Sequence, residues 1–373
     1  MTDILFFSLA KHQSHYFQNI SNALALDSQV ITLRELPLPG RGSFDRTVLA
    51  LDFATLVEEK CQERQIKGKY CGVYYKLALR LEMFWTALRM QAWIKREKPQ
   101  ALAIWNGSNR YCRLFSGLFP KQALRFHFEN GLLPGTTTLD TKGVNFHNSV
   151  PRDARFYRNY ATTIALGNEE QAVKLIPRKP RISGQIEVVL PEQFFFIPFQ
   201  DDRDSQVRYF SPHIQNMREL FEWARKLNQA CGIPVILKEH PSSREKYPDL
   251  HAATHSGLFF ANGNSTQELI EKSLAVITLN STVGLEAILL SKPVITLGQA
   301  FYTVEGVCEH ADSLESLIDL VKRYPNWFLD PQIRLAFLHY LANQYCVPGR
   351  WQDGDDTHIH EVARRIEVAF SKH

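Results

Sequence analysis

The sequence lacks the patterns that mark several specialised classes of protein. It has no dense run of basic residues, because its net charge of +4 comes from scattered Lys and Arg. That distribution argues against a dedicated nucleic-acid surface, and it suits an anionic small molecule or an anionic membrane face. No apolar segment approaches the roughly 18 residues needed to span a bilayer. If the protein works at a membrane, we expect it on the surface.

Two further absences concern the cellular compartment. The six cysteines include no CxxC pair and no histidine spacing suited to zinc. We therefore expect reduced core cysteines in a cytosolic protein. The N-terminus, MTDILFFSLAKHQ, has an acid before its short apolar run and no small-residue cleavage site, which predicts a first strand rather than a signal peptide.

What the sequence does contain is the material for two α/β domains. Its 373 residues, 45% of them hydrophobic, exceed the roughly 250–300 residues at which one core stops growing. Strand-like and helix-like patterns alternate, which is typical of parallel sheets covered by helices. The predicted strands are 3–9, 29–33, 101–105, 123–128, 193–199, 234–238, 275–279 and 293–297, and the clearest predicted helices are 15–26, 48–66, 73–97, one closed by Gly232, and one capped by Asp312 and Glu315.

The basic, proline-punctuated segment 177–183 reads as an interdomain linker. We expect an N-terminal Rossmann-like domain over 1–180, a C-terminal Rossmann-like domain over 184–328, and helices over 329–373 that pack back toward the N-terminal domain. Two doubly wound domains of this kind place a ligand cleft between them at the carboxyl ends of the strands. Polar residues just after strands are therefore the candidates for a functional site.

The segment LNSTVGLEA (279–287) carries the strongest local signal. A buried strand runs into Asn280, Ser281 and Thr282, Gly284 allows close approach of the backbone, and a helix starts at once. Free N–H groups and two hydroxyls at a helix start favour an anion. The structural alternative is an ordinary helix cap.

The segment KEHP (238–241) also follows an apolar strand directly. Pro241 fixes the turn and keeps His240 out of any helix, so Lys238 and His240 would lie at the carboxyl edge of the sheet. A single histidine is more often a structural group. Its position beside a second anion-binding element in the same half of the chain favours the site.

The segment QDDRDSQ (200–206) carries three carboxylates within four residues. One interpretation is a DxD metal clamp for a sugar nucleotide at 202–204, and a second makes one aspartate a nucleophile or base. The third is a solvated acidic turn. Arg203 supplies an internal counter-ion that a metal site would not need.

Residues 128–153 read as a long polar loop that starts after the strand ending at Phe128. Glu129 at its start would present a carboxylate from the N-terminal domain, and a carboxylate from each domain beside an anion site suits glycosyl chemistry. The alternative is that Glu129 binds N–H groups of the following loop. Gly131, Pro134 and Gly143 would shape the backbone of this loop.

Together these segments resemble a known family. FENGLLP, TLDTKGVNFHNSVPRDARFYR, FQDDRDSQ, KEHP and LNSTVGLEA resemble, in order and spacing, the bacterial capsule polysaccharide synthesis proteins that are retaining β-Kdo transferases. Kdo is 3-deoxy-D-manno-oct-2-ulosonic acid. The resemblance covers roughly residues 100–310 and implies a GT-B fold, CMP-β-Kdo as donor and no metal for transfer. Family products include Kdo linkers on capsule lipid anchors and β-Kdo caps on O-antigen.

The resemblance also implies roles for individual residues. Its Q-x-x-x-D-S/A pattern falls on Gln200 and Asp204, which makes Asp204 the nucleophile of a double displacement, and Glu129 the base that deprotonates the acceptor. The helix start at 280–284 with Lys238 and His240 would balance the single phosphate of the donor. The other proposed donor and sugar contacts are Glu286 toward the ribose, Arg110, Arg152 or Arg208 toward the Kdo carboxylate, and Gly131, Asp140 and Asn145 in the loop. Asp140, Asn145 and Arg152 would alternatively hold this loop in place.

Other readings stay open. The same short motifs occur in CMP-sialic acid-dependent sialyltransferases, and a non-catalytic saccharide-binding subunit of a capsule assembly complex is a different class. The expected partners are CMP-Kdo and a saccharide or glycolipid acceptor, with peripheral association at the cytoplasmic face of the inner membrane and no nucleic acid. The loops 8–17 and 105–111 mix aromatic, basic and amide groups, which suits contacts with an acceptor sugar.

Overall fold

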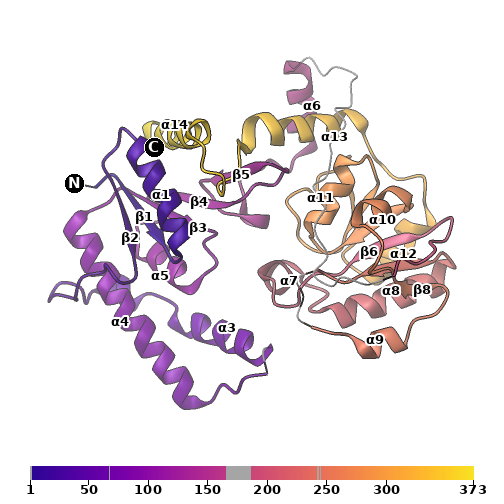
Figure 1. The fold of residues 1–373 in the computed structure, drawn as a ribbon, viewed down its shortest axis with the longest axis horizontal. Helices are drawn as coiled ribbons and strands as arrows, with labels where there is room; N and C mark the ends of the chain where they lie inside the picture. Colours follow the sequence, from indigo (N-terminus) through magenta and orange to yellow (C-terminus); the bar gives the residue numbers. More distant parts are fainter. Residues whose placement is uncertain (1, 67, 165–185, 242, 244) are drawn as a thin grey trace. The chain divides into compact units, whose positions relative to one another are not determined.

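The computed structural model describes residues 2–66, 68–164, 186–241, 243 and 245–373. The predicted linker at 177–183 lies outside the described residues. The chain forms two compact units: the first comprises Met1–Ser149 with Tyr345–His373, and the second comprises Val150–Gln344. Each unit contains one six-stranded sheet with helices on it (Figure 1). The predicted α/β class with two Rossmann-like sheets is confirmed.

The sheet of the first unit has the strand order β12-β5-β4-β3-β1-β2. The four strands from β2 to β4 run parallel, and β5 and β12 are antiparallel additions at one edge. The order reverses between β1 and β3, which makes this pair the switch point of the sheet. The strands are β1 (Ile4–Ser8), β2 (Ser28–Thr32), β3 (Ala101–Trp105), β4 (Leu124–Asn130), β5 (Thr136–Asp140) and β12 (Val347–Pro348).

Both faces of this sheet are buried, as parallel strands require. Alternate residues of β1 enter different cores: Ile4 and Phe6 pack with α1 and α14, and Leu5 and Phe7 pack with the helices of the opposite face. Figure 1 shows α1 and α14 side by side over the sheet. The helices are α1 (Lys11–Ala23) and α14 (Asp356–Ser371) on one face, and α2 (Arg46–Leu49), α3 (Phe53–Ile66), α4 (Val73–Glu97) and α5 (Arg110–Leu118) on the other.

The sheet of the second unit is parallel throughout, with the order β11-β10-β9-β6-β7-β8. Read from β8, this is the 3-2-1-4-5-6 order of the Rossmann fold, and its switch point lies between β6 and β9. The strands are β6 (Phe195–Pro198), β7 (Val235–Lys238), β8 (Leu258–Phe260), β9 (Ala275–Thr278), β10 (Val294–Thr296) and β11 (Glu309–His310).

One face of the second sheet packs on α8 and α12, and α11 lies against β9 and β10. The helix α8 runs from its N-cap Asn216 to Gly232, whose left-handed φ of 71° closes it as predicted. The helices of this unit are α6 (Ala154–Thr163), α7 (Ser205–Phe210), α8 (Met217–Cys231), α9 (Pro248–Ala252), α10 (Thr266–Lys272), α11 (Thr282–Leu289), α12 (Leu314–Lys322) and α13 (Pro331–Tyr340).

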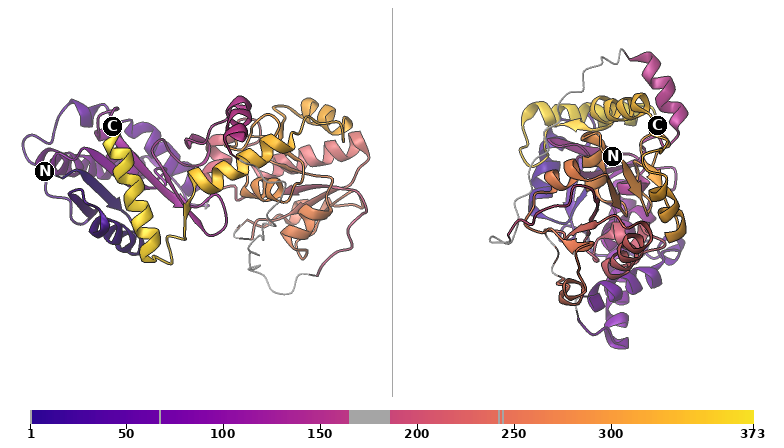
Figure 2. Two further views of the ribbon diagram at one scale, coloured as in Figure 1. Left: turned by 90° about the horizontal axis from the view of Figure 1, so that it is seen from above. Right: turned by 90° about the vertical axis from the view of Figure 1, so that its right-hand side faces the viewer.

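The division into units differs from the expected boundaries of 1–180, 184–328 and 329–373. The first unit ends at Ser149, because α6 packs on α13 through aromatic contacts such as Tyr157 with Phe337, at 5.4 Å between ring centroids. The segment 329–373 is itself split between the units. α13 belongs to the second unit, whereas β12 and α14 complete the first (Figure 2).

The prediction of a long loop over 128–153 is wrong for the first part of this segment. Residues 124–140 form a β-hairpin of β4 and β5, followed by the short 3-10 helix η1 (Asn145–His147). The run Thr136–Thr138 is β-branched and favours a strand, and Thr137 and Thr138 are buried. Strand β5 was missed because its buried side chains, Thr137, Thr138 and Asp140, are polar and give no hydrophobic alternation.

Other predicted details change by a few residues. The first helix begins at Lys11 rather than near residue 15. The helix α12 is capped by Ser313 and Ser316, which form a reciprocal capping box, rather than by Asp312 and Glu315. The predicted strands are present with ends shifted by up to two residues, and β5, β8, β11 and β12 were not predicted.

The prediction of six reduced cysteines is wrong for one pair. Cys61 on α3 and Cys71 before α4 form a disulfide, with their Cα atoms 5.7 Å apart. The reversal of the chain between the two helices brings them together, which their spacing of ten residues did not reveal. The other four cysteines are free, and three of them, Cys112, Cys308 and Cys346, are buried.

We predict that Gly131→Ala destabilises the protein. A Cβ at Gly131 would lie 1.9 Å from the hydroxyl oxygen of Thr136 and 2.3 Å from its carbonyl carbon, so the β4–β5 turn must move. We expect a loss of about 2–3 kcal/mol in the free energy of unfolding, measured by urea denaturation. Gly42→Ala is the control, because nothing lies within 4 Å of the added atom. Equal stability of the two variants would contradict this account of the turn.

Candidate functional site

The end of β6 and the end of β9 meet at the switch point of the second sheet through two buried amides. Gln200 Nε2 donates to Asn280 Oδ1 at 3.0 Å, and the backbone N–H of Asn280 donates to Gln200 Oε1 at 3.3 Å. Asn280 Nδ2 also donates to the carbonyls of Gln206 and Phe210, at 2.9 and 3.2 Å. Gln200 and Asn280 were predicted to contact substrate and donor, but these polar groups bind one another and α7.

The start of α11 follows directly. Ser281 is its N-cap and accepts from the N–H of Val283 at 3.2 Å, while Thr282 is the first helical residue and is exposed. At Gly284, which was predicted to allow close approach of the backbone, a Cβ would lie 2.4 Å from the hydroxyl of Tyr302. The glycine therefore makes room for Tyr302, which donates to the carbonyl of Ser281 at 2.6 Å. Glu286 is half-buried one turn further along the helix.

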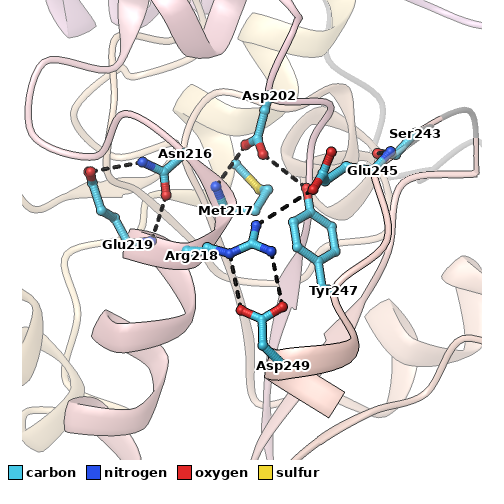
Figure 3. Close-up of polar contacts among 9 residues, drawn as sticks. All are labelled: Asp202, Asn216, Met217, Arg218, Glu219, Ser243, Glu245, Tyr247 and Asp249. Atoms are coloured by element: carbon cyan, nitrogen blue, oxygen red, sulfur yellow. Dashed lines mark hydrogen bonds and ion pairs between the residues drawn. The ribbon is translucent and has the colours of Figure 1, made fainter. Parts of the chain in front are cut away.

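The three aspartates after β6 are held in three different ways. Asp202 accepts from the backbone N–H of Met217 at 2.8 Å and from the hydroxyl of Tyr247 at 3.0 Å, one bond on each carboxylate oxygen. Burial raises the pKa of Asp202. Figure 3 shows this carboxylate between the start of α8 and Tyr247.

The same close-up shows what holds Tyr247 in place. Arg218 forms two hydrogen bonds with Asp249, at 3.0 and 3.1 Å, and its guanidinium lies 5.1 Å from the centre of the Tyr247 ring (Figure 3). Arg218 also lies 3.8 Å from Glu245. Asp202 is therefore part of a structural network that ties the acidic turn to α8 and α9, and it is a poor ligand for a DxD metal clamp.

Asp204 is the N-cap of α7 and accepts from the N–H of Gln206 at 2.9 Å. It is exposed, in contrast to Asp201 and Asp202, which are half-buried. Asp201 accepts from the N–H of Arg203 at 3.0 Å. Arg208 follows one turn after Asp204 on α7, with its guanidinium 5.3 Å from the centre of the Tyr209 ring. Of the three acids, Asp204 is the most accessible.

The KEHP segment lies at the end of β7, next to β6. Lys238 does not point its ammonium to solvent: it donates to the carbonyls of Asn262 and Asn264 at 2.7 and 2.6 Å, and burial lowers its pKa. This lysine closes the loop after β8, which the sequence did not indicate. His240 and Pro241 follow in an irregular segment and are half-buried.

In the first unit, Glu129 lies at the end of β4 and is held on both carboxylate oxygens. Asn106 Nδ2 donates to Oε2 at 2.5 Å, and Asn130 donates to Oε1 from its backbone N–H at 2.8 Å. Asn106 follows β3 and has a left-handed φ of 60°, a conformation uncommon for a residue other than glycine. Asn106 is thus a site residue that the sequence analysis missed; its position directly after a strand was the available signal.

Asp140 was predicted either to hold the loop in place or to contact the sugar, and its environment favours the first role. It is 2% exposed, and its two oxygens accept from five donors: the N–H groups of Lys142, Gly143 and Ser149, the Ser149 hydroxyl and the hydroxyl of Tyr345, at 2.6 to 3.1 Å. A carboxylate with this many donors has little capacity left for a sugar hydroxyl. Asp140 therefore holds the loop 141–149 and the returning segment at Tyr345.

The remaining predicted residues are dispersed. Arg110 begins α5, where it donates to the hydroxyl of Tyr111 at 2.6 Å, and its Nε has no hydrogen-bond partner among the described residues. Asn145 has a left-handed φ of 54° at the start of η1. Arg152 lies in the second unit and donates to the carbonyl of Val150 at 3.4 Å.

A group of aromatic rings lies next to Glu129 in the first unit. Trp351 Nε1 donates to Asn130 Oδ1 at 2.8 Å, and its ring lies 4.6 Å from that of Trp105 and 5.4 Å from that of His12. Tyr16 closes the group at 6.0 Å from Trp351. Segments 8–17 and 105–111 were expected to be loops that contact the acceptor, but His12 and Tyr16 lie on α1 and Trp105 ends β3. Both segments contribute to one group together with Trp351, which lies far along the sequence and was not predicted.

Two properties of the described residues bear on the chemistry of the site. No group of three His, Cys, Asp or Glu side chains among them lies close enough to hold a metal ion. None of the helices in the described part of the chain is long and apolar enough to cross a bilayer.

Comparison with known proteins identifies the family of the second unit. Residues 178–348 match the family model described as capsule polysaccharide biosynthesis protein. Protein FixF of Sinorhizobium fredii is 33% identical over 255 residues, which are 68% of this chain and 61% of FixF. The capsule polysaccharide export protein KpsS of Escherichia coli is 23% identical over 247 residues, 48% of this chain and 62% of KpsS. The chain spans less than two thirds of either relative.

The fold has a counterpart among solved structures. The structure of Thermosulfurimonas dismutans KpsC described as a beta Kdo 2,7 transferase superposes with a TM-score of 0.50 at 15% identity, over 98% of this chain and 99% of that one. This similarity concerns the fold alone, and it agrees with the expected GT-B-like pair of Rossmann-like units. The predicted resemblance to the capsule polysaccharide synthesis proteins is confirmed for residues 178–348, which match the capsule polysaccharide biosynthesis family.

Proposed function

We propose that the protein is a glycosyltransferase that moves Kdo from CMP-β-Kdo to a saccharide or glycolipid acceptor, with retention of configuration, in the synthesis of capsule, O-antigen or a related surface polysaccharide. The observation that carries the proposal is the placement of two polar elements at the switch point of a 3-2-1-4-5-6 sheet: the exposed Asp204 after β6 and the start of α11 after β9. Nucleotides bind at this point in open parallel sheets.

The start of α11 suits the phosphate of the donor. CMP-Kdo has a single phosphate, and a helix N-terminus with the exposed Thr282 offers N–H groups, a hydroxyl and the positive end of the helix dipole. Because the ammonium of Lys238 is bound to two carbonyls, His240 is the better cationic group of the KEHP segment for the donor. We propose that transfer needs no metal, and that Glu286 binds the ribose.

The proposed chemistry proceeds in two displacements. A carboxylate oxygen of Asp204 attacks the anomeric carbon of Kdo and the bond to the phosphate breaks, so CMP leaves with the bonding electron pair. Glu129 then takes the proton of an acceptor hydroxyl, whose oxygen attacks the same carbon and releases Asp204 as a carboxylate. Two inversions give net retention. Arg110, Arg152 and Arg208 remain the candidates for the Kdo carboxylate.

The acceptor is proposed to contact the first unit. The rings of Trp105, Trp351 and His12 lie near Glu129 and suit stacking on sugar rings. We propose a cytoplasmic location at the inner face of the inner membrane, where a glycolipid acceptor would be reached from the surface.

A panel of donors tests the proposed function directly. We expect release of CMP from CMP-Kdo in the presence of a Kdo-terminated oligosaccharide, with the same rate after EDTA treatment, because the phosphate is bound by protein groups. Turnover of CMP-sialic acid instead would identify the sialyltransferase alternative. Absence of binding to either donor in calorimetry would favour a non-catalytic saccharide-binding subunit, and loss of activity with EDTA would contradict metal-free transfer.

We predict that Asp204→Asn abolishes a covalent Kdo adduct that the wild-type protein forms with CMP-Kdo, as seen by intact-protein mass spectrometry. Asparagine caps helices as well as aspartate does, so α7 should keep its start and the loss should reflect chemistry. Asp201→Asn is the matched control and should retain the adduct. An adduct of wild-type yield on Asp204→Asn would remove Asp204 as the nucleophile.

For the acceptor step we predict different effects at Glu129 and Asn106. Glu129→Gln should keep adduct formation and lower transfer by about 100-fold or more, because a proton acceptor is lost. Asn106→Ala removes the donor to Glu129 Oε2, and we expect a roughly tenfold lower kcat with an unchanged KM for the donor, since Asn106 acts by positioning Glu129. Asn326→Ala, an exposed asparagine elsewhere, is the control. A changed donor KM with unchanged kcat would assign Asn106 to donor binding instead.

A further inference from the structure

The helix α4 exposes a continuous stripe of large apolar side chains. Its members, called here the outer stripe of α4, recur at helical spacing and have exposed fractions of 80, 90, 55, 59 and 49%: Val73, Tyr74, Leu77, Leu81 and Trp85. Isolated exposed apolar residues are common on protein surfaces, but a contiguous row of this kind marks an interaction site.

The core of the first unit already uses the opposite side of the same helix. Leu79, Met83, Ala87 and Met90 are buried in the cluster that covers the sheet. A helix that is apolar on both sides is normally buried on both sides. The folding of the first unit therefore does not account for the apolar side chains of the outer stripe.

The stripe lies in a hairpin that holds its shape. The helices α3 and α4 pack against each other along this hairpin. Figure 1 shows α3 and the first half of α4 running away from the sheet of the first unit. At the turn, Tyr70 is 86% exposed and extends the apolar surface.

Positive charges flank this surface without acidic partners. Among the described residues, none of Arg64, Lys69 and Arg80 forms an ion pair, and Arg64 lies over the ring of Tyr75 at 4.3 Å. The acids of α3 have other basic partners: Glu58 pairs with Lys76 on α4 at 2.9 Å, Glu59 pairs with Arg113 on α5, and Glu63 pairs with Lys60 at 2.6 Å. The surface combines tyrosine, tryptophan and leucine with unpaired cations, which is the composition of helices that lie in a lipid interface.

We propose that the outer stripe of α4, with Tyr70 and the flanking cations, docks on an anionic lipid bilayer. The apolar side chains would enter the boundary between headgroups and acyl chains, while Arg64, Lys69 and Arg80 would bind lipid phosphates. The proposal rests on the proposed function for its purpose, which is to bring a glycolipid acceptor within reach. A second copy of the chain is the less suitable occupant, since the same unpaired cations would face each other across the interface.

Flotation with vesicles of defined composition tests the proposal on the full-length protein. We expect binding to vesicles of phosphatidylglycerol and phosphatidylcholine at about 1:2, weakening as salt is raised, and little binding to phosphatidylcholine alone. The double variant Leu77→Ser/Leu81→Ser should lower the partition coefficient about tenfold or more, and Arg80→Glu about tenfold. Phe328→Ser is the matched control: this residue is 56% exposed in the second unit and should leave binding unchanged.

Other outcomes would overturn the proposal. The proposal is overturned if the wild-type protein does not bind the anionic vesicles, or if the double variant binds them as strongly as the wild type. The surface would be assigned to a second copy of the chain if the wild-type protein does not bind vesicles and sediments as a dimer, and the double variant Leu77→Ser/Leu81→Ser sediments as a monomer. Thermal unfolding checks that the variants are folded, and because the substituted side chains are exposed, we expect the wild-type melting temperature.

The same variants separate this proposal from the proposed function. Release of CMP from CMP-Kdo with a water-soluble oligosaccharide acceptor should be within about twofold of wild type in the double variant, because neither leucine is one of the proposed site residues. Vesicle binding without any CMP-Kdo turnover would retain the docking surface and reject the transferase. Turnover of CMP-Kdo without vesicle binding would retain the transferase and reject the docking surface.

Discussion

Gln200 and Asn280 exchange two hydrogen bonds in the buried interior of the second unit, and the candidate donor site is arranged around them. Gln200 follows the apolar strand β6, Asn280 lies two residues after Thr278 at the end of β9, and both side chains are buried away from water. Leaving either unpaired would cost about 1–3 kcal/mol. Asn280 further binds two carbonyls of α7, so the helix that presents Asp204 and the helix that begins after Ser281 are fixed to the same two strand ends. The chemistry proposed for Asp204 depends on this spacing.

The positions of the candidate residues could be predicted from the sequence, whereas their partners could not. Apolar runs followed at once by polar residues located the ends of β4, β6, β7 and β9, because parallel strands bury both faces and end in solvent at one edge. Whether such a residue is available to a ligand depends on groups distant in sequence. Lys238 is bound by the Asn262 and Asn264 carbonyls, Asp140 by Tyr345, and the space at Gly284 is filled by Tyr302. No local pattern indicates those contacts.

The missed elements have a common physical origin. Strand β5 buries threonine side chains in place of aliphatic ones, and the threonine hydroxyls donate to carbonyls. The hydrophobic alternation that identifies a strand is therefore absent. Trp351 reaches Asn130 across a sequence separation of 221 residues, and Asn106 reaches Glu129 only because β3 and β4 are neighbours. In each case the decisive contact follows from sheet order rather than from residue type. Strand order itself became apparent only in the structure.

The return of the chain at Tyr345 makes the second unit an insertion within the first. Strand β12 and helix α14 supply Val347, Ile359, Val362 and Ile366 to the core of the first unit, so the segment before residue 150 is an incomplete domain until the last residues have been synthesised. The inserted unit is different: it begins just before α6 and ends just after α13, and these two helices pack on each other. The second unit can therefore form as soon as it emerges from the ribosome, whereas the first must wait for β12 and α14.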